Sequence, residues 1–181
     1  MKSRILGRML TVAALAAGAL CASIPDDSSL ARSIRHEVLM YPRYTMWDDI
    51  AFRVENGRVE LNGEVTQPYK KDELGKIVAS IPGVTAVTND LKVLPFSTFD
   101  DRLRIQVARA IYGDPVLSRY GMGAIPSIHI IVDNGHVTLT GSVATENDRQ
   151  VAFIRASGAG LAFGPVDNRL SVEQPAKSKK S

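Results

Sequence analysis

The chain has 181 residues, of which 45% are hydrophobic and 23% are charged, with one cysteine and one tryptophan. This composition is that of a folded globular protein, and it excludes a collagen-like, a disulfide-stapled or a wholly disordered chain. The net charge of the chain is +3. Three of the 22 basic residues and none of the acidic residues lie in residues 1–22, so the remainder is balanced, with 19 basic and 19 acidic residues. Nucleic-acid binding needs a concentrated excess of cations, so the balance argues against a nucleic-acid partner.

The N-terminus has the pattern of a secretory signal peptide. Residues 1–8 are positively charged, and residues 9–22 form an uncharged apolar run that ends in small residues. A membrane-spanning helix needs about 20 apolar residues, so this run is short for a membrane span. We therefore expect a signal peptide over residues 1–22, cleaved after Ala22, and an exported protein. An uncleaved anchor or a buried helix is the alternative.

Cys21 raises the question of a lipid anchor. A bacterial lipoprotein carries its lipidated cysteine directly after a small residue, whereas Leu20 precedes Cys21 here. We therefore expect Cys21 to leave with the signal peptide, with lipidation at Cys21 as the alternative. Without Cys21 the mature chain contains no cysteine, which excludes disulfides, thiolate metal sites and a cysteine nucleophile.

An internal repeat organises the rest of the chain. Residues 50–65 (IAFRVENGRVELNGEV) and residues 128–143 (IHIIVDNGHVTLTGSV) share eight identical positions at a spacing of 78 residues. Apolar and polar residues alternate on both sides of an Asn-Gly pair, which is typical of a β-hairpin with a tight turn. The sequence therefore predicts strands over residues 49–55 and 58–66, and again over residues 127–133 and 136–144.

Further elements flank each hairpin. A helix precedes it, with apolar residues every four positions, and a second helix and a short strand follow it (87–93 and 166–172). We expect an α+β protein of two small tandem domains over residues 26–95 and 100–173, each with two helices on one face of a three-stranded sheet. Residues 174–181 are predicted to be a disordered basic tail.

Each copy resembles the BON domain, a bacterial module named after osmotically induced and nodulation proteins. The second copy departs from the family pattern at residues 160–165, where the Gly-Val pair is absent and one residue is inserted. The resemblance implies a periplasmic cell-envelope protein that supports the envelope under osmotic or envelope stress, often through phospholipid association, and it implies no catalytic residue. The matching residues form two patterns, Val54-x-Asn56-Gly57-x-Val59-x-Leu61-x-Gly63-x-Val65 and Ile81-x-Gly83-Val84-x-x-Val87-x-Asn89-x-Leu91-x-Val93.

Six of the repeated residues are expected to serve the fold. Glycine in an Asn-Gly turn adopts the positive φ that the turn requires, and glycine inside a strand marks a bulge or a close backbone approach. Asparagine near the last strand can cap a neighbouring backbone group. These structural positions are Gly57, Gly63, Asn89, Gly135, Gly141 and Asn168.

The sequence offers little chemistry. His36, His129 and His136 lack the spacing of a metal site, and no nucleophile elbow or phosphate-binding loop is present. On the alternating pattern His129 is expected to face the polar side of its strand. The acidic pairs 26–27 and 100–101 stand where helices begin, and we expect them to complement the helix dipole. We expect no catalytic activity, no metal and no cofactor.

The first helix of the second copy carries the candidate binding surface. At 100° per residue, Ile105 and Tyr112 fall opposite the core-facing Leu103, with Arg102 and Arg109 beside them. An apolar residue among arginines suits peripheral contact with anionic lipid. The first copy repeats the pattern more weakly, with Leu39 among arginines. The alternative is that these arginines pair with acidic residues between the two copies.

We therefore predict a non-enzymatic envelope protein that binds anionic phospholipid surfaces, with envelope proteins as further candidate partners. The rival hypothesis is a periplasmic chaperone or protein-interaction module, which would need exposed apolar surface. The rival hypothesis would find that apolar surface at Trp47, Phe52, Met122 and the loop 114–126. The sequence leaves the oligomeric state open.

Overall fold

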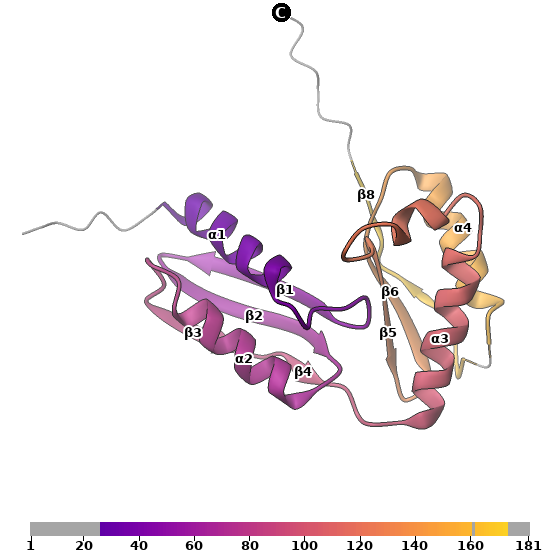
Figure 1. Ribbon diagram of the computed structural model, residues 1–181, viewed down its shortest axis with the longest axis horizontal. Coiled ribbons are helices and arrows are strands. Elements are labelled where there is room, and N and C mark those ends of the chain that lie inside the picture. The colour runs from indigo at the N-terminus through magenta and orange to yellow at the C-terminus, as the bar shows by residue number, and fades with distance from the viewer. Residues whose placement is uncertain (1–25, 161, 174–181) are drawn as a thin grey trace, which may run out of the picture.

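The computed structural model describes residues 26–160 and 162–173. The predicted signal peptide, Cys21 and the predicted tail lie outside these residues. Two similar α+β halves follow one another along the chain and are joined by a short linker (Figure 1). No helix in the described ranges is both long and apolar enough to cross a membrane.

The first half begins with a helix that carries apolar residues on one side. Leu30, Ile34 and Val38 are its buried residues, one on each successive turn, so a single face of the helix meets the sheet. The elements of this half are α1 (Asp27–Met40), β1 (Asp49–Glu55), β2 (Arg58–Val65), α2 (Pro68–Ala79), β3 (Ala86–Asn89) and β4 (Lys92–Val93).

The second half repeats this order with one addition, a short 3-10 helix in the loop before its hairpin. Ser97 caps its first helix, because the Ser97 hydroxyl accepts a hydrogen bond from the Asp100 amide at 3.2 Å. Its elements are α3 (Thr98–Tyr112), η1 (Ser118–Gly121), β5 (Ile128–Asp133), β6 (His136–Val143), α4 (Glu146–Ser157), β7 (Asp167–Asn168) and β8 (Ser171–Val172).

Each half contains a mixed sheet whose final strand is interrupted. β1 pairs antiparallel with β2, while β3 and β4 both run parallel to β2. Asn89 stands at the break, where its side chain donates to the Lys71 carbonyl at 2.8 Å and accepts from the Leu91 amide at 3.3 Å. Asn168 makes the same two contacts in the second half, with Arg149 and Leu170. The predicted third strand is therefore present as two short pieces, and the predicted fold class is confirmed.

The hairpin turns have the left-handed backbone that the Asn-Gly pairs predict. Asn56 and Gly57 have φ values of 51° and 75°, and Asn134 and Gly135 have 51° and 80°. Asp27 accepts hydrogen bonds from both amides of the first turn, at 2.9 and 3.1 Å. The acidic residues at the helix starts thus do more than complement the dipole, because they tie each helix to the tip of its hairpin.

Asp100 makes the equivalent contacts in the second half, accepting from the Asn134 and Gly135 amides at 3.0 and 2.8 Å. Since Asp27 and Asp100 have the same role, they align α1 with α3 at an offset of 73 residues. Gly63 and Gly141, inside the second strands of the hairpins, also have positive φ and approach the backbone of the neighbouring strand closely.

The segment before β1 packs on the edge of β5 and joins the two halves. The Ile130 amide donates to the Met46 carbonyl at 2.8 Å, and the ring of Tyr44 stacks on His129 with 5.3 Å between centroids. The Nδ1–H of His129 donates to the Asp48 carbonyl at 2.7 Å. The expectation that His129 faces a polar surface is therefore wrong, because the first half covers it and leaves it buried.

Candidate functional site

Three side chains on one side of α3 form the surface that we call the α3 outer face, namely Arg102, Ile105 and Arg109. All three are exposed, and Ile105 retains 45% of its accessible surface. The two arginines are seven residues apart, which is about 10 Å along a helix, and Ile105 lies between them. The helix therefore presents one apolar side chain between two cations.

Arg102 and Arg109 differ from other arginines of the same half in having no carboxylate within ion-pair distance among the described residues. Arg119 pairs with Asp148 at 2.6 Å, and Arg155 pairs with Asp114 at 2.7 Å. The alternative that Arg102 and Arg109 join the two copies through acidic partners is not what the structure shows. Their charges are available to an anion from outside the chain.

Tyr112, the fourth residue predicted for this surface, is placed differently. It is half-buried, and its hydroxyl donates a hydrogen bond to the carbonyl of Ile128 in β5. Burial raises the pKa of Tyr112 well above its usual range. Tyr112 therefore serves the packing of the helix on the sheet, and we leave it out of the α3 outer face.

Arg104 lies two turns before Tyr112 in α3 and donates a hydrogen bond to the same edge of β5. It is 6% exposed, pairs with Asp101 at 2.5 Å and donates to the Val132 carbonyl at 2.7 Å. At the offset of 73 residues, Arg104 and Tyr112 of α3 correspond to Ala31 and Leu39 of α1. The side chains of Ala31 and Leu39 have no hydrogen-bond donor. Side chains from the helix thus cap the edge of β5, whereas β1 has no such caps from α1.

Phe96 adds an apolar group that the sequence reading missed. It lies in the linker between the two halves, directly before α3, and is 87% exposed. The signal in the sequence was a large aromatic residue between Pro95 and Ser97 in a short linker, since such a residue gains nothing from exposure to water.

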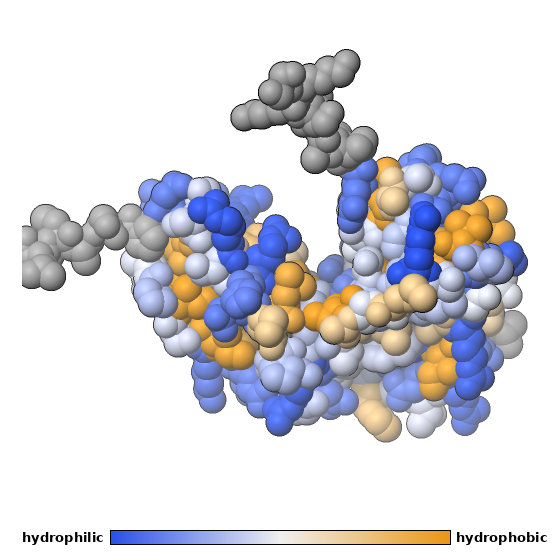
Figure 2. Space-filling view, turned by 45° about the horizontal axis from the view of Figure 1, so that its top comes forward, coloured by the Kyte–Doolittle hydropathy of each residue, from blue (hydrophilic) through white to orange (hydrophobic). Residues whose placement is uncertain are grey.

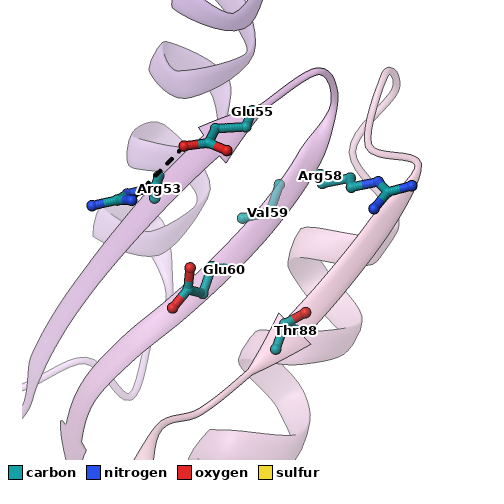
Figure 3. Close-up of a pocket in the computed structure, with 6 residues that line it drawn as sticks. All are labelled: Arg53, Glu55, Arg58, Val59, Glu60 and Thr88. Carbon is teal, nitrogen blue, oxygen red and sulfur yellow. Dashed lines mark ion pairs between the residues drawn. The ribbon is translucent and has the colours of Figure 1, made fainter.

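The described residues hold no group of histidine, cysteine and acidic side chains arranged to bind a metal ion. A depression of about 220 Å³ lies on the first sheet, lined mostly by charged residues of β1 and β2, with Val59 of β2 and Thr88 of β3. Figure 3 shows these side chains. Arg53 and Glu55, two residues apart on β1, form an ion pair at 3.8 Å, and both are strongly exposed. An exposed pair of this kind has the character of a solvated surface and offers no activated nucleophile or base.

The residues named for the rival hypothesis do not form one apolar surface. Trp47 packs against the core of the second half, and Phe52 is half-buried beneath the guanidinium of Arg35, 5.8 Å from its ring centroid. Met122 is 85% exposed but stands alone near the end of η1. On the face drawn in Figure 2, hydrophobic surface occurs in separate patches among hydrophilic residues.

Comparison with known proteins identifies the class of domain. The BON domain family matches residues 26–95 and residues 100–174. The chain belongs to the BON domain family and carries two copies of the domain, as the resemblance predicted. Two BON domains support a non-enzymatic protein of the envelope type.

A search among curated proteins gave no match. Among solved structures, the chain is similar to CdsD, a structural protein of the type III secretion system of Chlamydia trachomatis, at 18% identity and a TM-score of 0.32. That likeness covers 80% of this chain and 61% of the CdsD chain. A second structure, of the C-terminal domain of CdsD, has the same identity and TM-score, with 82% of this chain and 66% of the other covered.

Proposed function

We propose that this protein binds anionic phospholipid surfaces in the periplasm through the α3 outer face and thereby supports the cell envelope under osmotic or envelope stress. The observation that carries the proposal is that Arg102 and Arg109, on either side of the exposed Ile105, have no carboxylate partner among the described residues. The signal-peptide pattern and the two BON domains support the compartment and the envelope role.

The physical basis is that of a peripheral membrane contact. Each arginine near an anionic bilayer surface contributes about 1 kcal/mol, and an apolar side chain adds the burial of its surface at the headgroup boundary. Two cations and one isoleucine give weak, reversible binding. A reversible contact of this strength suits a protein that samples the membrane surface and is not fixed to it.

We expect the chain from residue 23 onward to float with vesicles of phosphatidylglycerol in low salt and to be released in high salt. The Debye length falls from about 10 Å at 0.1 M salt to about 3 Å at 1 M, which removes attraction between exposed charges. The double variant Arg102→Glu, Arg109→Glu is expected to lose at least about 30-fold in affinity, since two contributions of about 1 kcal/mol disappear. Vesicle flotation measures both effects.

The matched control is the double variant Arg58→Glu, Lys76→Glu, which makes the same change in net charge on exposed positions of the first domain. It is expected to float like the unaltered chain. If both double variants lost binding equally, net charge and not the α3 outer face would be responsible. An absence of flotation under every condition would refute the proposal for the unlipidated protein and favour the protein-interaction hypothesis.

A further inference from the structure

A groove of about 380 Å³ lies between the two domains, directly beside the α3 outer face. Its walls come from the segment before β1, the two residues between β2 and α2, the linker and α3. The residues that line it are Trp47, Thr66, Gln67, Pro95, Phe96, Asp101, Arg104 and Ile105. Its volume is within the range of ligand pockets, about 300–1,000 Å³.

Large apolar side chains converge on this groove from three separate segments. Trp47 belongs to the first domain, Phe96 to the linker and Ile105 to α3. Phe96 and Ile105 are both exposed, with 87% and 45% of their accessible surface retained. Apolar side chains from three segments that line one groove are typical of a ligand pocket.

The charges around the groove indicate what kind of molecule would fill it. Arg102 and Arg109 stand one turn before and one turn after Ile105 on the same helix face, and neither has a carboxylate partner among the described residues. The cation inside the groove, Arg104, is already neutralised by Asp101. A ligand with its negative charge at one end and an apolar chain at the other therefore matches the site, with the charge outside the groove and the chain inside.

We propose that the groove between the domains holds an acyl chain of an anionic phospholipid whose phosphate contacts Arg102 and Arg109. This inference rests on the proposed function and deepens it, because it assigns the lipid chain a place in the protein. A chain in the groove covers Phe96, Ile105 and the indole of Trp47. Binding thus requires both domains, since Trp47 comes from the first and Ile105 from the second.

The test uses Trp47, the single tryptophan of the chain, as a local reporter. Dihexanoyl phosphatidylglycerol below its micelle concentration is titrated into the chain from residue 23 onward, with no membrane present. We expect a saturable change in tryptophan emission at one lipid per protein. Glycerophosphoglycerol, which has the headgroup without chains, and dihexanoyl phosphatidylcholine, which has no net charge, are expected to give little change.

Two variants, Phe96→Ser and Ile105→Ser, each remove one apolar side chain from the wall of the groove. Each is expected to weaken lipid binding about tenfold, because serine buries much less apolar surface against an acyl chain than phenylalanine or isoleucine does. Both positions are exposed, so these variants are expected to fold, and circular dichroism checks this. Ile154→Ser, at an exposed isoleucine of α4 outside the groove, is the matched control and is expected to bind normally.

The result separates this inference from the proposed function. If anionic vesicles still floated the protein while monomeric lipid left Trp47 unchanged, the groove assignment would be wrong and the surface contact would stand. If the headgroup alone gave the full response, the site would recognise phosphate and not a chain. If Ile154→Ser weakened binding as much as Ile105→Ser, the effect would be one of general surface hydrophobicity, and the inference would be overturned.

Discussion

Replacing Asp48 with alanine is expected to destabilise the first domain by about 3–5 kcal/mol, because the change leaves a buried ammonium group without its partner. Asp48 is 0% exposed, and its carboxylate accepts a hydrogen bond from the Lys70 ammonium at 2.6 Å. The backbone amides of Thr45 and Thr66 also donate to it, at 3.0 and 2.9 Å, as do both threonine hydroxyls. One side chain thus joins the segment before β1 to the end of β2 and to α2.

Urea unfolding followed by the fluorescence of Trp47, the neighbouring residue, measures this loss. The control is the double variant Asp48→Ala, Lys70→Met, which removes both charges and is expected to recover most of the stability, since an apolar replacement of a buried ion pair is often close to neutral. Equal destabilisation in the single and the double variant would show that the unpaired Lys70 charge is not the cause.

The same carboxylate makes the first domain sensitive to acid. Burial alone would raise the pKa of Asp48, but the hydrogen bonds from Lys70, Thr45 and Thr66 outweigh it and hold the pKa below its ordinary value. The stabilisation is therefore complete above the unfolded pKa, near 3.9, and is lost as the pH falls through the lower folded pKa. We expect the stability of Asp48→Asn to depend less on pH across this acid range than that of the unaltered chain.

Gly141→Ala is expected to destabilise the second domain by at least about 3 kcal/mol. Gly141 has a φ of 101°, a conformation that costs an L-residue about 1–3 kcal/mol. A Cβ atom there would also overlap the carbonyl oxygen of Ser127, which accepts the Ser142 amide at 3.0 Å. Because that obstacle is backbone, relief requires the start of β5 to move.

Gly158→Ala is the matched control for this prediction. Gly158 follows α4 with ordinary negative φ, and the nearest atom to an added Cβ is the Ile154 carbonyl oxygen at 3.6 Å. Its replacement is expected to change stability by less than about 1 kcal/mol. Thermal unfolding by circular dichroism compares the two variants. A Gly141→Ala protein as stable as Gly158→Ala would contradict the close backbone approach at Gly141.

Local patterns in the sequence predicted the hairpins, because alternation and Asn-Gly pairs act within a few residues. They could not predict the contact between the two domains, which depends on how separate elements meet. A signal for it existed, since Ile131 of β5 stands where β1 has Arg53, at a position that alternation assigns to the solvent face. Ile131 is buried, and its neighbours Ile130 and His129 contact Met46 and Tyr44 of the first domain.

The α3 outer face, too, was predicted only as far as a local pattern reaches. Helical periodicity placed Arg102, Ile105 and Arg109 on one exposed face. It also placed Tyr112 there, because an angle around the helix axis does not say how far a long side chain reaches toward a neighbouring strand. Phe96 and Trp47 lie outside any periodic pattern, so only the folded chain brings them to Ile105.

Residues 44–48 cover one edge of β5, so the order of the two repeats matters as the chain emerges and folds. A domain folds as a unit while the chain emerges, beginning at the N-terminus. When the chain emerges N-terminus first, the Met46 carbonyl that accepts the Ile130 amide is therefore in place before β5 appears. With the repeats in the opposite order, β5 would emerge first, and the edge that does not pair with β6 would stay exposed until the covering segment followed.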